Sequence, residues 1–421
     1  MAKNQIISVV YKDMEIGKIG YDADQKKSFF QYHPDFLASN QYKRMFPYII
    51  RRTPSVQVFS EFEGETFRGL PSMIADSLPD VFGNLIFKEW LEFNHKKAVN
   101  ISPLEQLTYV GKRGMGALEF MPSKTITTEA EINIDEISEV VKKVLDVKSS
   151  IHEKNLSDLA LRNIFKIGTS AGGARPKILI SEHKQSGAII AGDLESSDTY
   201  SHYLIKLAID EESGYSKEKV EFVYYQLATS IGIEMMPSKL IDDKHFATLR
   251  FDRQNGEKQH VLTASGMTGW DFKKPENSNY DNLFKLAIDL KVPHKDIQQL
   301  FKRMVFNLVF ANIDDHLKNF SFIYDDEKDK WNLTPAYDLT YPLDALMNYT
   351  RVSRAMAINN KRADINRQDV LDLAERYSIK NAKGIINEVV EATEHFKKLC
   401  DEQNLPDKVI QKIYSEFNFL L

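Results

Sequence analysis

Short runs of apolar and β-branched residues, separated by polar turns, open the chain. Three such runs lie at residues 6–11, 18–21 and 28–32, and each has the length and composition of a β-strand. A different pattern begins at Ser102, where a serine is followed by a proline and, three residues after the serine, by a glutamate. That order is typical of a helix start with the serine as N-cap. The sequence therefore predicts a β-rich beginning that gives way to helices.

The middle of the chain mixes the two patterns. We expect a helix that ends near Gly168, strands around residues 177–181 and 203–209, and a helix that starts at about Ser216. A polar turn at residues 254–259 follows, so this part of the chain combines strands and helices.

From about residue 280 the pattern is mainly helical. Apolar residues recur at helical spacing between residues 385 and 399, which predicts one buried helical face. Two β-like runs within residues 320–338 interrupt this pattern and flank a charged stretch. We therefore expect a hairpin inserted in a helical domain.

Composition limits the class of protein. The 421 residues predict two or three domains, and 43% hydrophobic with 27% charged residues is typical of a globular protein. A net charge of −5 gives no general attraction for nucleic acid. The single cysteine, Cys400, excludes an internal disulfide and a cysteine-based zinc site. No apolar run reaches the roughly 18 residues that span a bilayer, and no signal peptide opens the sequence. We expect a cytoplasmic protein with no membrane partner.

The strongest chemical pattern is a group of polar residues on either side of the expected hairpin. A kinase needs an aspartate that accepts a hydroxyl proton, an asparagine five residues later and a second aspartate downstream for magnesium. Asp314, Asn319 and Asp338 have this order and spacing. Lys318 is placed to neutralise a γ-phosphate, and His316 to brace the loop. Capping of helix ends and turns explains any one of these residues alone, but the whole set favours catalysis.

A run of small residues forms a second candidate site. Gly172, Gly173 and Ala174 precede Arg175 and Lys177, between a predicted helix and a predicted strand. Small residues allow backbone N–H groups to approach phosphate oxygens. The run is neither a Walker A motif nor the Gly-x-Gly-x-x-Gly loop of ordinary protein kinases. Taken alone, it is explained equally well as a flexible surface turn.

Lys206 lies between apolar residues of a predicted strand. An unpaired buried charge is costly, so this lysine needs a partner. Nucleotide phosphates would serve, with Glu221 on the following helix as an orienting carboxylate. The alternatives are an edge-strand lysine that extends to water, and a solvated helix face that carries both Glu218 and Glu221.

Other conspicuous residues are more simply assigned to the core. Trp270 and Phe272 follow a small-residue segment and are expected in the core rather than at a substrate edge. The ten histidines show no metal-ligand spacing, and Cys400 is expected to be a core residue rather than a nucleophile.

Taken together and in order, these segments resemble the HipA family of bacterial toxin kinases. The N-terminal segments that look like the family are Phe67-Arg68-Gly69-Leu70-Pro71, residues 75–80 and residues 115–119. Residues 170–177 look like its ATP-covering loop, and residues 249–253 lie where its interlobe hinge ends. Asp314-x-His316-x-Lys318-Asn319 and Tyr337-Asp338 match its catalytic and metal motifs.

The resemblance implies an α+β fold. It is a two-lobed, protein-kinase-like fold with a mixed α/β N-terminal lobe, an extra β-rich subdomain and an all-α C-terminal lobe. The implied domains are residues 1–120 (β-rich subdomain), 121–255 (N-lobe with the ATP-covering loop) and 256–421 (C-lobe with the catalytic and metal-binding loop).

The resemblance also implies roles for single residues. Asp314 would be the catalytic base, with Lys318 and His316 beside it, and Asn319 and Asp338 would bind Mg²⁺. The residues implied to contact ATP are Gly172, Gly173, Ala174, Arg175, Lys177, Lys206, Thr248, Leu249 and Arg250. A serine in the place of Ser170 is the family's autophosphorylation site, which silences the enzyme, and Thr169 is the neighbouring hydroxyl.

The implied substrate is a protein hydroxyl, and known family substrates include an aminoacyl-tRNA synthetase. The implied partner is a small helix-turn-helix antitoxin of the HipB type, which carries the pair to operator DNA. Two alternatives stay open: a small-molecule kinase, which uses the same acidic residues, and a non-catalytic regulator that binds antitoxin and DNA. The presence of Asp314, Asn319 and Asp338 argues against a non-catalytic regulator. The family resemblance argues against a small-molecule kinase.

Overall fold

The structure is a computed structural model, and it describes residues 5–93, 101–124, 133–145, 175–192, 197–209, 215–342 and 353–420. Two compact units divide the chain. The first unit comprises Met1–Ile209, Ala247–Leu262 and Gly266–Gly269, and the second comprises Asp210–Phe246, Thr263–Ser265 and Trp270–Leu421. The domain boundaries expected from the sequence stay a prediction.

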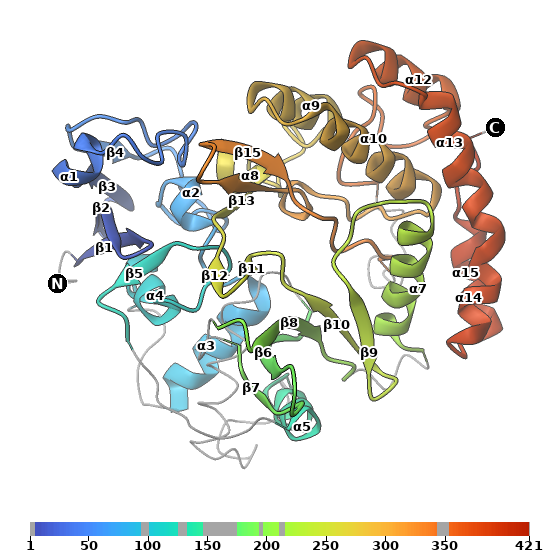
Figure 1. Ribbon diagram of the computed structural model, residues 1–421, viewed down its shortest axis with the longest axis horizontal. Coiled ribbons are helices and arrows are strands. Elements are labelled where there is room, and N and C mark those ends of the chain that lie inside the picture. Colours follow the sequence, from blue (N-terminus) through green and yellow to red (C-terminus); the bar gives the residue numbers. More distant parts are fainter. Residues whose placement is uncertain are drawn as a thin grey trace. The chain divides into compact units, whose positions relative to one another are not determined.

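An antiparallel sheet with the strand order β4-β3-β2-β1-β5 forms the beginning of the first unit (Figure 1). Its strands are β1 (Gln5–Tyr11), β2 (Met14–Asp22), β3 (Lys27–Tyr32), β4 (Gln57–Phe59) and β5 (Glu119–Met121). Alternate residues of β1 are buried, and Ile7 pairs directly with Ile19 of β2. The three opening strands predicted from short β-rich runs are therefore confirmed.

The helices of the first unit lie between and after these strands. They are α1 (Pro34–Ala38), α2 (Ser72–Ala75), α3 (Val81–Phe93), α4 (Pro103–Val110) and α5 (Ile134–Leu145). The Ser102 hydroxyl accepts a hydrogen bond from the Glu105 N–H at 3.0 Å, which is the N-cap that the sequence predicted for α4.

The Phe67-Arg68-Gly69 motif is a tight turn in which only glycine fits at position 69. Gly69 has a φ of +83°, and a Cβ at this position would lie 2.6 Å from the Lys26 carbonyl oxygen. The neighbouring Arg68 donates a hydrogen bond to the Gln106 side chain at 2.7 Å. The motif therefore joins the turn to α4.

A second sheet has the strand order β7-β6-β8-β10-β9. Its strands are β6 (Lys177–His183), β7 (Ile189–Ala191), β8 (Tyr200–Lys206), β9 (Ser238–Ile241) and β10 (His245–Leu249). The two strands predicted near residues 177 and 203 are confirmed, although β8 begins and ends three residues earlier than expected. The polar turn after β10 is a short hairpin of β11 (Arg253–Gln254) and β12 (Glu257–Lys258). The helix expected to end near Gly168 lies outside the described residues.

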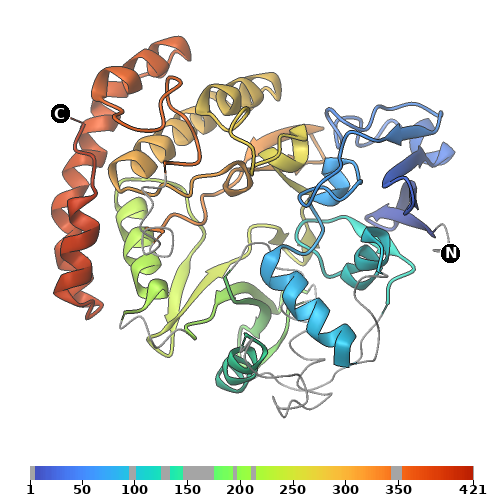
Figure 2. The same ribbon diagram turned by 180° about the vertical axis from the view of Figure 1, so that it is seen from behind.

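The second unit is mainly helical, as Figure 2 shows from behind. The Tyr224 ring packs edge-on against Phe306, Phe310 and Phe396, so residues far apart in sequence form one aromatic core. The helices that begin or lie in this unit are α7 (Lys217–Ser230), α8 (Ala264–Thr268), α9 (Tyr280–Asp289), α10 (His294–Val309), α12 (Arg367–Arg376), α13 (Ala382–Glu391), η3 (Ala392–His395), α14 (Phe396–Glu402) and α15 (Asp407–Ser415). Of the apolar stripe predicted between residues 385 and 399, Ile385, Ile386, Val389 and Phe396 are buried, while Val390 and Leu399 are half-buried. Cys400 is buried, as expected.

One hairpin interrupts these helices, as the sequence predicted. It consists of β14 (Ser321–Asp325) and β15 (Lys330–Leu333), and β13 (Val261–Thr263) adds a third strand beside β14.

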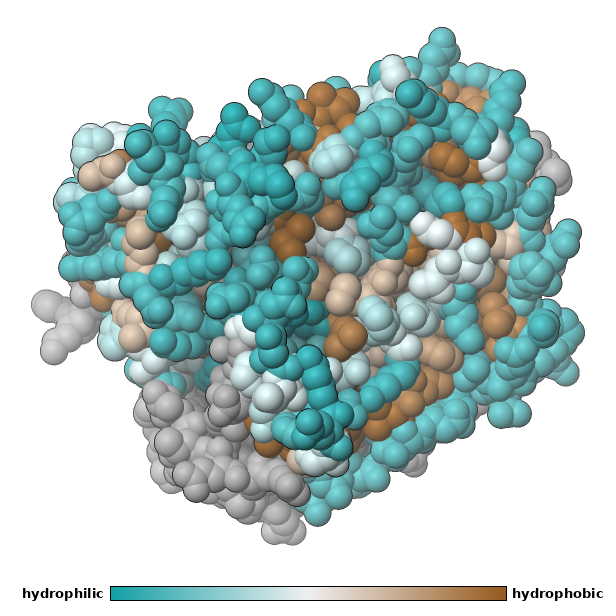
Figure 3. Space-filling model, in the orientation of Figure 1, coloured by the Kyte–Doolittle hydropathy of each residue, from teal (hydrophilic) through white to brown (hydrophobic). Residues whose placement is uncertain are grey.

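Polar and charged side chains cover most of the face seen in Figure 3, with apolar side chains in scattered patches. Within the described ranges, no helix has the length and apolar character that crossing a membrane requires.

Candidate active site

The loop that carries Asp314 begins where α10 ends. Ala311 adopts a left-handed conformation (φ +54°) that turns the chain out of the helix, and a short 3₁₀ helix, η2 (Leu317–Asn319), closes the loop. The Asp314 carbonyl accepts hydrogen bonds from the His316 N–H and from the Asn319 side-chain N–H, each at 2.9 Å. The Asn319 amide nitrogen thus holds the loop, and its amide oxygen takes no part in this bond.

The two neighbouring aspartates of this loop have opposite environments. Asp314 is exposed, whereas Asp315 is only 1% exposed. The Asp315 carboxylate accepts hydrogen bonds from Tyr280, Arg354 and the Met356 N–H. Asp315 is therefore held by three protein donors, whereas Asp314 is exposed to solvent.

The hairpin returns the chain to this loop. The Tyr337 hydroxyl donates to the Lys318 carbonyl at 2.8 Å and also bonds the Ser321 hydroxyl. The Asn312 side chain donates to the Asp338 carbonyl at 3.3 Å. Asp338 itself has a φ of +53°, a conformation that non-glycine residues rarely adopt and that clusters at functional sites. Residues 337 and 338 are thus hydrogen-bonded to the segment 312–321, which contains Asp314 and Asn319.

His316 and Lys318 share an aromatic neighbour that the sequence did not identify as part of this site. The Phe272 ring lies 4.9 Å from the His316 ring, and the Lys318 ammonium lies 5.5 Å from the centre of the Phe272 ring. Phe272 and Trp270 are half-buried rather than fully buried, so the expectation of simple core residues was wrong. A lysine over an aromatic face is a favourable contact. Phe272 therefore packs against two polar residues of the loop and stabilises it.

The basic residues predicted to hold phosphates lie on the second sheet, in the first unit. Lys177 on β6 is the direct antiparallel partner of Lys206 on β8, and both side chains are buried. The Arg175 Nη1 atom is also buried, and it has no hydrogen-bond partner among the described residues. Gly172, Gly173, Ala174, Ser170 and Thr169 lie outside the described residues.

The predicted hinge residues lie at the end of β10 and just beyond it. Thr248 and Leu249 are half-buried in the strand, and the Arg250 N–H donates to the His202 carbonyl at 2.9 Å. The Arg250 side chain is buried and makes two hydrogen bonds to the Asp252 carboxylate, at 2.9 and 2.8 Å. The Arg250 guanidinium is therefore occupied by an internal ion pair with Asp252, which stabilises the fold.

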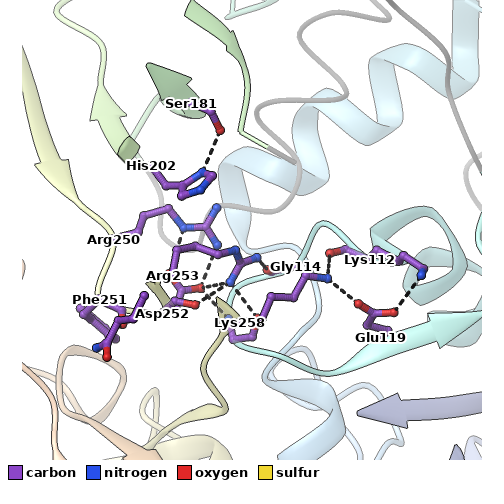
Figure 4. A network of polar contacts seen from close by, with 12 residues as sticks. Lys112, Gly114, Glu119, Ser181, His202, Arg250, Phe251, Asp252, Arg253 and Lys258 are labelled. Atoms are coloured by element: carbon purple, nitrogen blue, oxygen red, sulfur yellow. Dashed lines mark hydrogen bonds and ion pairs between the residues drawn. The ribbon is translucent and has the colours of Figure 1, made fainter. Parts of the chain in front are cut away.

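Asp252 is the centre of a buried polar network, which Figure 4 shows with Arg250 and Arg253 both directed toward it. It also accepts a hydrogen bond from the Gly116 N–H at 2.8 Å. Burial alone would raise the pKa of Asp252, but the two guanidinium groups outweigh burial and lower that pKa below its usual range. Asp252 thus stays ionised, and it ties the end of the hinge to the family-like segment at residues 115–119.

The network continues in both directions from this centre (Figure 4). Arg253 donates to the Gly114 carbonyl at 2.9 Å, and Lys258 contacts Glu119 at 2.5 Å. On the other side, the His202 ring contacts the Ser181 hydroxyl at 2.8 Å. Burial, with Arg250 nearby, lowers the pKa of His202 to about 4, so this histidine is neutral at pH 7.

Glu218 and Glu221 on α7, in the second unit, are both buried. The alternative of a solvated helix face for these two residues was therefore wrong. The Ser216 hydroxyl caps the helix by accepting from the Lys219 N–H at 3.1 Å.

Comparisons with known proteins agree with this organisation. Residues 7–121 match the model of the HipA N-terminal domain, and residues 169–396, more than half of the chain, match the HipA-like C-terminal domain. The resemblance predicted from the motifs is confirmed.

Two curated relatives show low identity over part of the chain. A putative kinase of Sinorhizobium fredii, Y4dM, is 23% identical over 231 residues, which cover 51% of this chain and 55% of that protein. The serine/threonine-protein kinase toxin HipA of Shewanella oneidensis is 23% identical over 259 residues, which cover 55% of this chain and 54% of that protein. The chain thus matches only about half the length of these relatives.

A solved structure covers nearly all of the chain. It is described as the Shewanella oneidensis MR-1 toxin–antitoxin system HipA, HipB and its operator DNA complex. The likeness has a TM-score of 0.63 at 16% identity and covers 97% of this chain and 95% of that chain. It confirms the predicted α+β, protein-kinase-like fold. With both domain models matched in order and the fold shared, this chain belongs to the HipA family.

Proposed function

We propose that this chain is an ATP- and magnesium-dependent serine/threonine protein kinase that acts as a toxin. The observation that carries the proposal is the hydrogen bonding between two segments of the second unit, residues 312–321 and residues 337–338. An exposed Asp314 lies five residues before Asn319, and Asp338 is bonded to the same loop through Asn312. Phosphoryl transfer needs a proton acceptor and two oxygen ligands for metal in this arrangement.

In this proposal Asp314 accepts the proton of the attacking hydroxyl. Its exposed carboxylate suits that role, because a base has to reach the substrate. The Asp338 carboxylate and the Asn319 amide oxygen hold Mg²⁺. Lys318, on the same loop, would supply a positive charge for the transferring phosphoryl group, and the His316 backbone bonds to Asp314 and Asn319 keep the loop closed.

The donor set fits ATP and Mg²⁺. Lys177 and Lys206 are buried cations, and the buried Arg175 Nη1 atom has no hydrogen-bond partner among the described residues, so these three side chains would supply donors for phosphate oxygens. Within the described ranges, no three acidic, histidine or cysteine side chains gather into a metal site of their own. That suits Mg²⁺, which is usually held by one or two carboxylates together with substrate phosphates. When bound, ATP supplies the γ-phosphoryl group.

The other nucleotide contacts in this proposal come from Gly172, Gly173 and Ala174 through their backbone, and from Thr248, Leu249 and Arg250 at the hinge. For Arg250 the contact would be made through its backbone, because its side chain is held by Asp252. Ser170 is the proposed autophosphorylation site, with Thr169 as the alternative hydroxyl. A phosphate there adds roughly −1.5 to −2 charges, which would repel the ATP phosphates and expel the loop.

The proposed substrate is a protein hydroxyl, with an aminoacyl-tRNA synthetase as the first candidate. The proposed partner is a HipB-like helix-turn-helix antitoxin, and operator DNA is reached mainly through it, because the chain carries a net charge of −5. The solved HipA, HipB and operator DNA complex supports this partner set. We place the protein in the cytoplasm, where its single thiol stays reduced.

Incubation of the pure chain with γ-labelled ATP and a cell lysate tests this function. We expect label on serine or threonine of one or a few proteins, identified by mass spectrometry. Label only on small molecules would mean a small-molecule kinase, and no label at all would mean a non-catalytic regulator. In pure protein from ATP-replete cells we expect phosphate on residue 170 or 169, absent from Asp314→Asn.

A further inference from the structure

Asp315 is the centre of a buried network that the catalytic roles above do not use. Its carboxylate accepts hydrogen bonds from the Tyr280 hydroxyl at 2.7 Å, from Arg354 Nη2 at 2.6 Å and from the Met356 N–H at 3.2 Å. The Asp315 and Arg354 side chains are 0% and 4% exposed. Burying an ion pair is costly unless further hydrogen bonds satisfy it, and these donors do so.

The first arm of this network brackets Asp314. Residues on both sides of Asp314 are bonded to one short segment, since the Ala355 N–H donates to the Ile313 carbonyl at 2.8 Å while Arg354 and Met356 bond Asp315. The backbone on each side of the proposed base is therefore held by this segment, and Asp314 itself is exposed.

The second arm runs from Asp315 toward the proposed metal ligand. The Tyr280 hydroxyl accepts a hydrogen bond from Asn307 at 3.1 Å, and Asn307 accepts one from Asn312 at 2.9 Å. Asn312 then bonds the Asp338 carbonyl, as described above. Tyr280, Asn307 and Asn312 are each no more than 2% exposed, so water does not compete for these bonds.

We propose that the relay Asp315–Tyr280–Asn307–Asn312 is a positioning element that sets the Asp314 loop and the Asp338 loop relative to each other. Asp338 has a left-handed backbone, and such a conformation persists only when its surroundings hold it in place. The relay holds that backbone through its carbonyl and the Asp314 backbone through Asp315. Its four members are buried, so the proposal gives them no direct contact with substrate or metal. The catalytic part of this inference rests on the proposed function, and the coupling of the two loops does not.

Tyr280→Phe tests the relay, because it removes the hydroxyl that joins the two arms. The ring would keep its edge-on packing against Phe320. Tyr224→Phe is the control: this tyrosine is equally buried and loses one hydrogen bond, to the Phe310 carbonyl at 2.6 Å, whereas Tyr280→Phe loses two, to Asp315 and from Asn307. Both variants should fold, and their melting temperatures would be compared.

Two measurements separate positioning from simple stability. In Tyr280→Phe we expect turnover to fall by roughly 10- to 100-fold and the magnesium concentration for half-maximal rate to rise, with the KM for the protein substrate unchanged. We also expect faster amide hydrogen exchange in peptides that cover residues 312–319 and 336–341. Tyr224→Phe should change neither.

A Tyr280→Phe enzyme with the wild-type rate, magnesium dependence and exchange would overturn the relay and leave the proposed function intact. Equal losses in Tyr280→Phe and Tyr224→Phe would also overturn it. If the wild type transfers no phosphate but Tyr280→Phe still loosens both loops, the coupling is supported and the kinase proposal fails.

Discussion

Lys177 and Lys206 lie directly opposite each other on neighbouring antiparallel strands, and both are buried. Like charges in such cross-strand positions repel each other. In the proposed function, both ammonium groups would contact the nucleotide phosphates, which have the opposite charge.

Replacing either lysine with methionine should weaken nucleotide binding. Methionine keeps the apolar stem and removes the charge, so the rise in melting temperature on adding Mg·ATP should shrink in both variants. Lys184→Met is the control, because Lys184 follows β6 and is exposed. A wild-type thermal shift in both Lys177→Met and Lys206→Met would exclude these lysines from the phosphate site.

The two proposed metal ligands, Asp338 and Asn319, should contribute unequally to Mg·ATP affinity. Asp338→Ala removes a carboxylate, so Mg·ATP affinity measured by calorimetry should fall together with activity. Asn319→Ala should have a milder effect, because an amide oxygen carries no net charge. Unchanged Mg·ATP affinity in both variants would show that the metal roles are misassigned.

The ion pairs of Asp252 should stabilise the fold much more than an exposed pair does. Asp252→Asn removes the carboxylate that pairs with the guanidinium groups of both Arg250 and Arg253. The free energy of unfolding, measured with denaturant, should therefore fall by about 3–5 kcal/mol. Asp243→Asn breaks an exposed pair with Lys219 and should cost at most about 1 kcal/mol. Similar losses in the two variants would contradict the role given to the buried network.

Stability should fall as the solution becomes acidic, partly because of two buried histidines. Burial lowers the pKa of His260 to about 4, and burial together with Arg250 does the same for His202. The unfolded chain therefore binds more protons between about pH 6.5 and pH 4, so this contribution is present above pH 6.5 and is lost on the way to pH 4.

Each histidine can contribute at most about 1.4 kcal/mol per pH unit in that range. Denaturant unfolding at pH 7 and pH 5 would measure the slope for the wild type, His202→Gln and His260→Gln. Each variant should have a shallower slope than the wild type. Slopes equal to that of the wild type would mean that these imidazoles do not titrate with unfolding.

Much of the fold could be predicted because it depends on local patterns. The strands β1 to β3 contain short runs of apolar and β-branched residues, the Ser102 cap marks the start of α4, and two apolar runs around a charged turn form β14 and β15. The order of Asp314, Asn319 and Asp338 likewise predicted which residues the hairpin would bring near one loop.

Other features could not be predicted, because they depend on contacts between distant residues. Nothing local distinguishes Asp314 from Asp315, since Asp315 is buried by Tyr280 and Arg354, 35 and 39 positions away. The pairing of Lys177 with Lys206 depends on strand register, and the place of Phe272 beside His316 depends on tertiary packing.

Phosphoryl transfer by Asp314→Asn is the most direct test of the account. This change keeps the size of the side chain and removes the proton acceptor, so the rate should fall by roughly 10²–10⁴ while Mg·ATP affinity largely survives. Asp364→Asn is the control, because Asp364 is an exposed loop aspartate of the same unit. A loss of this size only in Asp314→Asn is the result we predict. Transfer at the wild-type rate by Asp314→Asn would contradict the proposed mechanism.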